Sequence, residues 1–364
     1  GSEMCIRDRD IFWGTRGFEN LAKAIKAGER GEFYPEEEED APYFRTLLTP
    51  SYTAYLKIAE GCDHTCNFCT IPAIKGKYHS RKMENLLAEA RQLAEKGVKE
   101  LNLIAQDTTY YGMDIYRKRA LPELLSELCR LPGISWIRLL YAHPEGITEE
   151  LLTTMAKEEK ICPYLDLPLQ HSSKKVLKMM GRGGSDKEFL ELIDHIRKKI
   201  PGVVLRSTFI VGHPGEGEKE FEELLNFLQK AELEKVGFFL YSREENTGSA
   251  RISPQVPYSV KMKRRNKLFS LQQKISENFN RTKKGKIIPV IVEGNIKGLM
   301  DFKDSKVRRW LRESDFYGRT LFDAPLIDGG VWIKGEAKMG EIIRAKILDN
   351  SCYDLLGVRV KGGV

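Results

Sequence analysis

The segment from residue 52 to residue 69 reads YTAYLKIAEGCDHTCNFC, an apolar run followed directly by three cysteines. Residues 52–58 have the composition of a buried strand, and Cys62, Cys66 and Cys69 follow with C-x3-C-x2-C spacing. In α/β barrels, the loops that follow the strands build the active site. We therefore expect the first strand of such a barrel here, with a metal-binding or redox loop at its carboxyl end.

The three cysteines predict an iron–sulfur cluster. Three thiolates on one loop can bind three irons of a [4Fe–4S] cluster and leave the fourth iron open to a small ligand. Soft thiolate ligands favour either iron–sulfur clusters or zinc. The alternative is a zinc site with His64 as the fourth ligand. However, His64 lies two residues from both Cys62 and Cys66, which crowds a tetrahedral site.

The length and composition limit the size and the class of the protein. The 364 residues suffice for two or three domains, and 41% hydrophobic with 30% charged residues is typical of a soluble protein. No apolar run approaches the ~20 residues of a membrane-spanning helix. No secretory signal opens the chain, so we expect a cytoplasmic location and no membrane partner. Seven cysteines, three of them crowded together, argue against a secreted disulfide framework.

Strand-like and helix-like segments alternate after the cysteine loop. The expected strands are 52–58, 101–105, 136–141, 164–168, 203–211 and 236–241. The expected helices are 84–96, 122–129, 148–158, 186–198 and 218–231, followed by a long basic helix at 258–284. Six such units predict an α/β fold, a partial (β/α)6 barrel that is open on one side.

The pattern of the sequence changes after Gly285, where the alternation of strand-like and helix-like segments ends. Short β-rich runs follow at residues 287–292, 331–334, 342–347 and 355–360. They predict a small antiparallel β-barrel with a long polar loop at 300–313. The expected domains are a remnant of an N-terminal domain with an acidic linker (residues 36–40) at 1–50, the α/β core at 51–284 and the β-barrel at 285–364.

Positive charge is concentrated in one stretch. Residues 251–286 contain eleven lysines and arginines against one acid, Glu277, although the whole chain carries a net charge of only +7. Such a stretch can bind nucleic acid or an acidic surface. It can equally be a solvated helix face, and the sequence leaves both readings open.

The cysteine motif, with aromatic Phe68 before its last cysteine, resembles the radical SAM superfamily. Four further runs are similar to the methylthiotransferases within it: IPAIKGK at 71–77, SR at 80–81, YLDLPLQH at 164–171 and GHPGE at 212–216. In such proteins the open iron of the cluster binds S-adenosylmethionine. The resemblance extends from about residue 52 to the carboxyl end of the chain.

Two regions resemble the RimO-type branch of the methylthiotransferases. One is AQDT at 105–108 with YG at 111–112, where the transfer-RNA branch usually shows a Gly-Gln-Asn-Val-like run. The other is GRT at 318–320 with DAPLIDG at 323–329, which is similar to the RimO-type TRAM domain. The resemblance therefore favours a protein substrate over transfer RNA.

The resemblance implies the activity and the partners. A methylthio group is added to the β-carbon of an aspartate in ribosomal protein S-twelve, alone or in the small ribosomal subunit. One S-adenosylmethionine supplies the methyl group, a second supplies the radical, and a flavodoxin-type protein supplies electrons. Two alternatives stay open: a transfer-RNA adenosine methylthiotransferase, and a non-catalytic module that holds zinc and docks on the ribosome.

The resemblance also suggests residues that contact the cofactor or substrate, although it assigns no catalytic side chain. Phe68 would lie near the adenine of S-adenosylmethionine, and glycines after the fifth strand could let the backbone approach the adenosyl group. For the others a packing or solvent role is the alternative, and for the glycines a tight turn. The candidates are Phe68, Gln106, Gln170, Arg206, Gly212 and Gly215.

Three departures from the family pattern stand out. His213 replaces a usual phenylalanine, and Lys82 replaces a common proline. Residues 10–15 and the short helix expected at 18–27 resemble only the tail of an N-terminal domain whose three cysteines hold a second cluster in full-length relatives. We therefore expect this chain to bind one cluster and to cleave S-adenosylmethionine without completing sulfur insertion.

Overall fold

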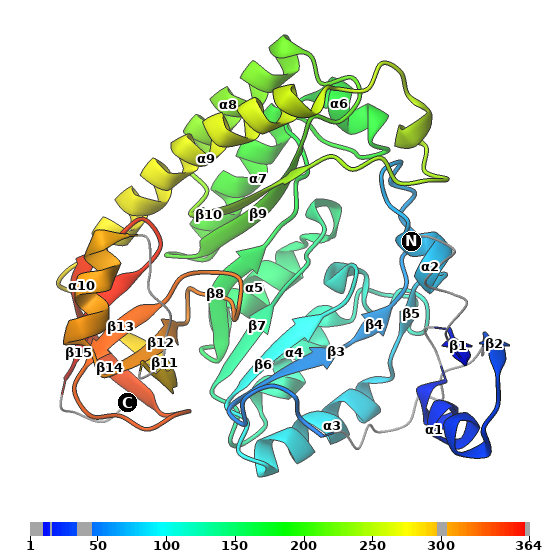
Figure 1. Cartoon of the computed structure of the whole chain (residues 1–364). Coiled ribbons are helices and arrows are strands. Elements are labelled where there is room, and N and C mark those ends of the chain that lie inside the picture. The colour runs from blue at the N-terminus through cyan, green and yellow to red at the C-terminus, as the bar shows by residue number, and fades with distance from the viewer. Residues whose placement is uncertain (1–9, 15–16, 35–45, 297–303, 361–364) are drawn as a thin grey trace.

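The computed structural model describes residues 10–14, 17–34, 46–296 and 304–360, so the acidic run 36–40 lies outside the described part. A curved sheet fills the centre of the molecule, and a small β-barrel covers one end of it (Figure 1). Among the described residues, no helix combines the length and the apolarity needed to cross a membrane.

The central sheet has six parallel strands in the order β10-β9-β8-β7-β6-β3. They are β3 (Thr53–Lys57), β6 (Glu100–Ile104), β7 (Trp136–Leu139), β8 (Ile161–Asp166), β9 (Val204–Val211) and β10 (Lys235–Leu240). Strands β3 and β10 are the two edges and do not pair with each other, so the barrel is open. The predicted fold class is confirmed.

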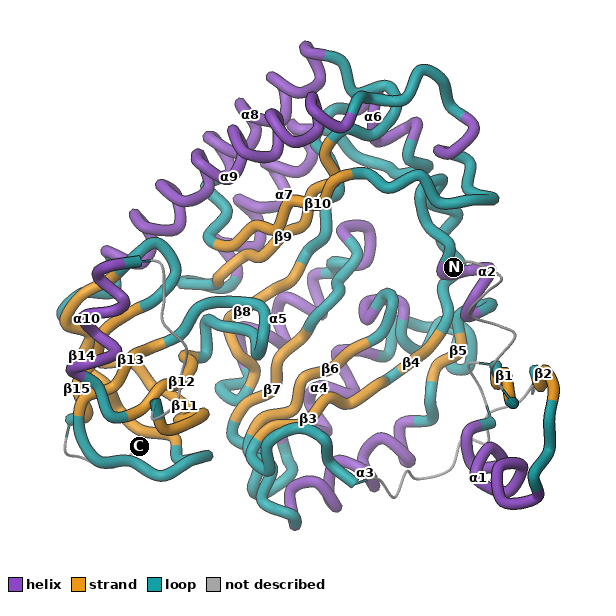
Figure 2. Tube along the Cα trace, in the orientation of Figure 1, coloured by secondary structure: helices purple, strands orange, loops and turns teal. Residues whose placement is uncertain are grey.

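Helices cover the outer face of the sheet (Figure 2). They include α3 (Met83–Glu95), α4 (Leu121–Cys129), α5 (Glu149–Lys157), α7 (Asp186–Lys199) and α8 (Glu218–Ala231). Thr148 caps α5, because its hydroxyl accepts a hydrogen bond from the Leu151 amide. Four elements too short for a periodic pattern escaped prediction: α2 (Ile71–Lys75), α6 (Lys174–Met179), β4 (Ala59–Glu60) and β5 (His79–Ser80).

The C-terminal domain is a closed barrel of five strands in the order β11-β12-β13-β15-β14. They are β11 (Ile287–Asn295), β12 (Phe316–Thr320), β13 (Val331–Lys334), β14 (Ile342–Asn350) and β15 (Leu355–Arg359). Strands β13 and β15 pair in parallel, so the expected antiparallel arrangement is wrong at that pairing. Strand β12 escaped prediction because Gly318 and Arg319 interrupt its apolar pattern.

The polar loop expected at residues 300–313 is wrong for its second half, where α10 (Ser305–Glu313) forms. Asp304 caps this helix by accepting hydrogen bonds from two amides of its first turn. Val307 and Trp310, three residues apart, pack with Trp332 in a small apolar cluster. Two buried side chains thus anchor a helix whose composition is otherwise charged.

The long basic helix is α9 (Tyr258–Arg281), which packs on α8 and β10 and reaches the C-terminal barrel (Figure 1). Part of its charge serves packing. Arg264 is buried and pairs with Glu216 at 2.8 Å, and buried Lys261 donates to the Tyr241 carbonyl at 2.8 Å. The exposed basic residues of the stretch are Arg251, Lys263, Lys267, Lys274, Arg281, Lys284 and Lys286.

A short N-terminal unit precedes the sheet. Strands β1 (Ile11–Trp13) and β2 (Gly31–Phe33) pair in parallel, and α1 (Phe18–Ala27) connects them. The helix expected at residues 18–27 is therefore confirmed. It ends at Gly28, which has a left-handed φ of 68° and donates its amide to carbonyls of the last turn.

A buried ion cluster joins the sheet to the C-terminal barrel. Glu100 begins β6 and is fully buried between Arg138 of β7 and Arg319 of β12. Its carboxylate lies 3.1 Å from Arg138 Nη2 and 2.5 Å from Arg319 Nη2. The two arginines also donate to the carbonyls of Leu321 and Asp323 in the barrel domain. A buried charge without a partner costs several kcal/mol, so these groups must stay together.

Glu100→Gln tests this cluster. Neutralising the carboxylate leaves buried Arg138 without a counter-charge and leaves Arg319 with Glu293 alone. We therefore expect the free energy of unfolding to fall by about 3–5 kcal/mol. Urea unfolding followed by tryptophan fluorescence measures the change. The matched control is Glu123→Gln, which removes an exposed partner of Lys118 and should leave the midpoint unchanged. Equal midpoints for Glu100→Gln and the wild type would contradict the assignment.

Acid should act on the same cluster. Burial alone would raise the pKa of Glu100, but Arg319 and Arg138 outweigh it and lower the pKa from 4.5 to about 2. Because the folded-state pKa is depressed, this contribution is fully present above pH 4.5 and is lost as the pH falls from 4.5 toward 2. We expect the stability difference between the wild type and Glu100→Gln to shrink across that window, measured by urea unfolding at successive pH values.

Candidate metal and cofactor site

The three cysteines of the C-x3-C-x2-C loop lie together at the carboxyl end of the sheet. The loop runs from β4 to α2 and carries Cys62, Cys66 and Cys69 as free, partly buried thiols. All three line one cavity of about 400 Å³. The other lining residues are Lys57, Ala59, His64, Phe68, Ile71, Ile104, Ala105, Gln106, Tyr141, His143, Gln170 and Arg182.

Hydrogen bonds and one glycine set the shape of this loop. Asn67 donates its backbone amide to the carbonyl of Met180 at 2.8 Å and its side-chain amide to that of Met179 at 2.9 Å. Gly61 enters the loop with a φ of 79°, and a Cβ there would lie 2.1 Å from the Lys77 carbonyl oxygen. Only glycine fits that position. The protein itself therefore holds the cysteines in place.

The thiols fit an iron–sulfur cluster in number and surroundings. Burial raises the pKa of Cys62 to about 11 and also raises the pKa of Cys69, so binding a metal must displace their protons. Arg182 Nη1 lies 3.9 Å from Cys66 Sγ. Three soft ligands in one half-buried cavity suit a cluster with one open iron.

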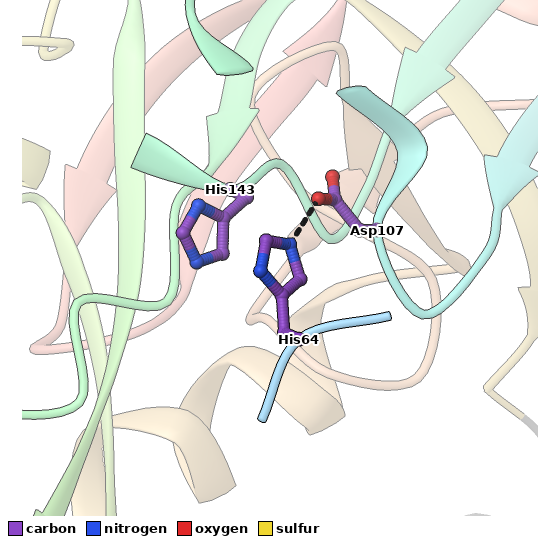
Figure 3. A group of neighbouring side chains, drawn as sticks. All are labelled: His64, Asp107 and His143. Atoms are coloured by element: carbon purple, nitrogen blue, oxygen red, sulfur yellow. Dashed lines mark hydrogen bonds and ion pairs between the residues drawn. The ribbon is translucent and has the colours of Figure 1, made fainter. Parts of the chain in front are cut away.

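His64 has a partner other than the thiols. Its Nε2 lies 2.8 Å from Asp107 Oδ2, and its ring stacks on that of His143 with centroids 4.1 Å apart (Figure 3). Burial raises the pKa of Asp107, but hydrogen bonds from His64 and Thr109 outweigh it and lower that pKa. The Nε2 atom of His64 is therefore engaged with a carboxylate rather than with the thiols.

Three of the predicted contact residues line the cysteine cavity: Phe68, Gln106 and Gln170. Phe68 belongs to the cysteine loop itself, Gln106 follows β6, and Gln170 follows β8. Three separate segments thus converge on the cavity from the carboxyl ends of the strands, where barrel active sites lie. Their contacts with S-adenosylmethionine stay predictions.

Arg206 does not line this cavity. Its Nη1 donates to Asp166 Oδ1 at 2.8 Å, and its Nε lies 4.0 Å from Asp328 Oδ1 in the C-terminal domain. It lines a separate cavity of about 450 Å³ beside α9 and the C-terminal barrel. Arg206 compensates buried Asp166, and its contact with cofactor or substrate stays a prediction.

Gly212 and Gly215 also lie outside the cavity lining. They have φ values of 75° and 96°, and a Cβ would lie 2.3 Å from the side chain of Lys261 at Gly212 and 2.4 Å from that of Met179 at Gly215. Both glycines lie in the tight turn after β9, where neighbouring side chains pack against the backbone. Their approach to the adenosyl group stays a prediction.

Tyr141, His143 and Arg182 line the cavity but were missed in the sequence. Tyr141 and His143 come just after β7, so the rule that places active sites at carboxyl ends of strands could have indicated them. Arg182 follows short α6 and has no such signal. Tyr141 and Gln170 have φ values of 57° and 69°, a conformation uncommon for non-glycine residues and frequent at functional sites.

Comparisons with known proteins agree with this geometry. The profile of the Radical SAM superfamily matches residues 56–228, and that of the TRAM domain matches residues 285–360. Ribosomal protein uS12 methylthiotransferase RimO from Caldanaerobacter subterraneus subsp. tengcongensis is 45% identical over 97% of this chain and 78% of that protein. The RimO of Pelotomaculum thermopropionicum is 47% identical over 96% of this chain and 78% of that protein.

A solved structure of coproporphyrinogen III oxidase (HemN) from Escherichia coli is also similar. It aligns with a TM-score of 0.47 and 17% identity, covering 73% of this chain and 63% of that one.

The open parallel barrel, the three-cysteine loop and the small C-terminal barrel define a radical SAM enzyme with a TRAM domain. Identities of 45–47% with the two RimO proteins over nearly the whole chain identify one family within this class. The chain belongs to the RimO family of methylthiotransferases.

Replacing any one cluster cysteine tests the site. After anaerobic reconstitution, we expect Cys62→Ala, Cys66→Ala or Cys69→Ala to lose most of the bound iron, because two thiolates cannot hold the cubane. Cys352→Ala is the matched control, since Cys352 lies outside the cavity in the C-terminal domain, and it should keep the wild-type iron content. Iron and sulfide assays give the readout. Full iron content in any of the three variants would remove that cysteine from the ligand set.

Proposed function

We propose that this chain carries the radical SAM and TRAM parts of a methylthiotransferase that adds a methylthio group to the β-carbon of an aspartate in ribosomal protein uS12. The convergence of all three motif cysteines on one cavity carries the proposal. The names of the relatives supply the substrate protein. A flavodoxin-type protein would serve as the electron donor.

Cys62, Cys66 and Cys69 would hold the cluster, with S-adenosylmethionine in the cavity beside them. When bound, these cofactors supply the radical chemistry that breaks an unactivated C–H bond, which side-chain acids and bases cannot do. The chain itself binds, orients and shields the reactants. Phe68 would face the adenine, and the amides of Gln106 and Gln170 would bind polar atoms of the cofactor or substrate.

We also propose one cluster in this chain. The other described cysteines lie apart from the cavity and from one another: Cys129 in α4, Cys162 in β8 and Cys352 before β15. None of them has the crowded loop spacing that a second cubane requires. With one cluster, S-adenosylmethionine is cleaved but no methylthiolated product forms. The domain division proposed is residues 51–284 for the radical SAM core and 285–364 for the TRAM domain.

A transfer-RNA substrate is the second candidate, and the exposed lysines and arginines of the 251–286 stretch are the observation behind it. Burial of Arg264 and Lys261 reduces the charge available to a phosphate backbone. Binding of transfer RNA at two salt concentrations separates the candidates, because phosphate contacts give a steep salt dependence. A steep slope with micromolar binding would favour transfer RNA, and weak or salt-insensitive binding would favour the protein substrate.

Anaerobic reconstitution tests the proposed activity. We expect about four irons per chain, the content of one [4Fe–4S] cluster, and release of 5′-deoxyadenosine when S-adenosylmethionine and a chemical reductant are added. Iron assays and chromatography of the nucleoside give the readout. About eight irons, or methylthiolated uS12 made by this chain, would contradict the single-cluster proposal. Zinc in place of iron, with no nucleoside released, would contradict the enzyme.

A further inference from the structure

A smaller cavity of about 150 Å³ adjoins the cysteine cavity. The two cavities share five lining residues: Gln106, Tyr141, His143, Gln170 and Arg182. The small cavity therefore opens beside the position where the cluster and S-adenosylmethionine would lie. Its size suits part of a side chain rather than a nucleoside.

The two cavities are lined by basic residues and by no acidic residue. No aspartate or glutamate lines either of them. Lys57, the one lysine of the lining, pairs with Glu60 at 2.8 Å, and Glu60 also pairs with Lys75. Arg182 has no carboxylate partner in the described part of the chain. Its Nη2 donates to the Pro168 carbonyl at 3.1 Å, and its Nη1 approaches Cys66 Sγ. A half-buried guanidinium of this kind attracts a carboxylate.

His143 adds a free donor to the same wall. The ring is about nine-tenths buried, and its Nδ1 accepts a hydrogen bond from the Glu145 amide at 3.3 Å. In the neutral ring the proton therefore sits on Nε2. Burial, reinforced by nearby Arg182 and His64, lowers the pKa of His143 to about 3, which keeps the ring neutral. Nε2 is buried and has no partner among the described residues, so a residue that lines both cavities carries an unsatisfied N–H donor.

The same tautomer argues against a metal ion at this place. His64, Asp107 and His143 offer ligand atoms within 4.8 Å of one another. A metal on His143 would need the Nε2 lone pair, but that nitrogen carries the proton when Nδ1 accepts from the Glu145 amide. The group therefore offers a hydrogen-bond donor rather than a cation site.

Two amide side chains complete the wall. Gln106 and Gln170 have no hydrogen-bond partner for their side chains within the described residues. The backbone of Gln170 is fixed in its left-handed conformation, because its amide donates to Thr208 and its carbonyl accepts from Ile210, each at 2.8 Å. A strained backbone held in this way keeps a side chain aimed at one place.

We propose that this cavity is the subsite for the carboxylate of the substrate aspartate, with Arg182 and the Nε2–H of His143 binding its oxygens. The amides of Gln106 and Gln170 flank the carboxylate. Held by its terminal oxygens, the aspartate presents its β-carbon toward the cysteine cavity. This inference rests on the proposed function, since it deepens the choice of an aspartate in uS12 as the substrate.

Two peptides test the subsite. One carries the uS12 sequence around the modified aspartate, and the other has asparagine at that position. With reconstituted protein and S-adenosylmethionine, fluorescence anisotropy measures both dissociation constants. We expect the wild type to prefer the aspartate peptide by about tenfold or more, the size of one charge-assisted hydrogen bond. Arg182→Gln and His143→Phe should each abolish that preference by weakening binding of the aspartate peptide alone.

Control variants keep the result specific. His143→Gln retains an N–H donor and should restore part of the preference that His143→Phe removes. Arg130→Gln and His195→Gln change exposed residues far from the cavity and should leave both affinities unchanged. Equal iron content and equal melting temperature of the variants exclude loss of the cluster or of the fold.

Several outcomes would overturn the subsite. They are equal binding of the two peptides by the wild type, no binding of either, and an unchanged preference in Arg182→Gln and His143→Phe. Weaker binding of S-adenosylmethionine with an unchanged peptide preference would assign the cavity to the carboxylate of the cofactor instead. Release of 5′-deoxyadenosine without peptide is measured in parallel, so a failed radical core is distinguished from a failed subsite.

Discussion

The pairing of Glu100 with Arg138 and Arg319 is the constraint on which the arrangement of the two domains depends. A carboxylate buried at the start of β6 must be compensated, and one of its two cations comes from the C-terminal barrel. Neighbouring contacts act in the same direction, since the hydroxyl of Tyr52 donates to the Glu293 carbonyl at 2.9 Å. The amino ends of the strands are thereby closed by the TRAM domain, as Figure 1 shows.

Because the TRAM domain closes the amino ends of the strands, the site lies at their carboxyl ends. The loops after β3, β6, β7 and β8 supply the cysteines, Gln106, His143 and Gln170, so neighbouring strands contribute one wall each. The cysteine loop is held by hydrogen bonds to the segment after α6, which also carries Arg182. Scaffold and site therefore share the same contacts, and a rigid loop presents its thiols to the cofactors.

The sequence predicted what local pattern encodes. Apolar runs and helical periodicity gave all six strands of the sheet, and the cysteine spacing gave the site. Helix α10 was not predicted, because only Val307 and Trp310 mark its buried face. The pairing of Arg206 with Asp166 was not predicted, because nothing in the sequence reveals that Asp166 needs a counter-charge. Arg182 was missed because its place depends on how α6 packs against the cysteine loop, a long-range contact that has no local signal.

The AQDT segment at 105–108, which resembles the RimO-type branch, is held by specific contacts of Asp107. Asp107 accepts two hydrogen bonds from Thr109 on one oxygen and pairs with His64 through the other. His64 in turn stacks on His143, whose buried Nε2 has no hydrogen-bond partner among the described residues. An asparagine at this position would lack the negative charge that holds His64. Asp107 thus positions, through two rings, the donor proposed to bind the substrate carboxylate.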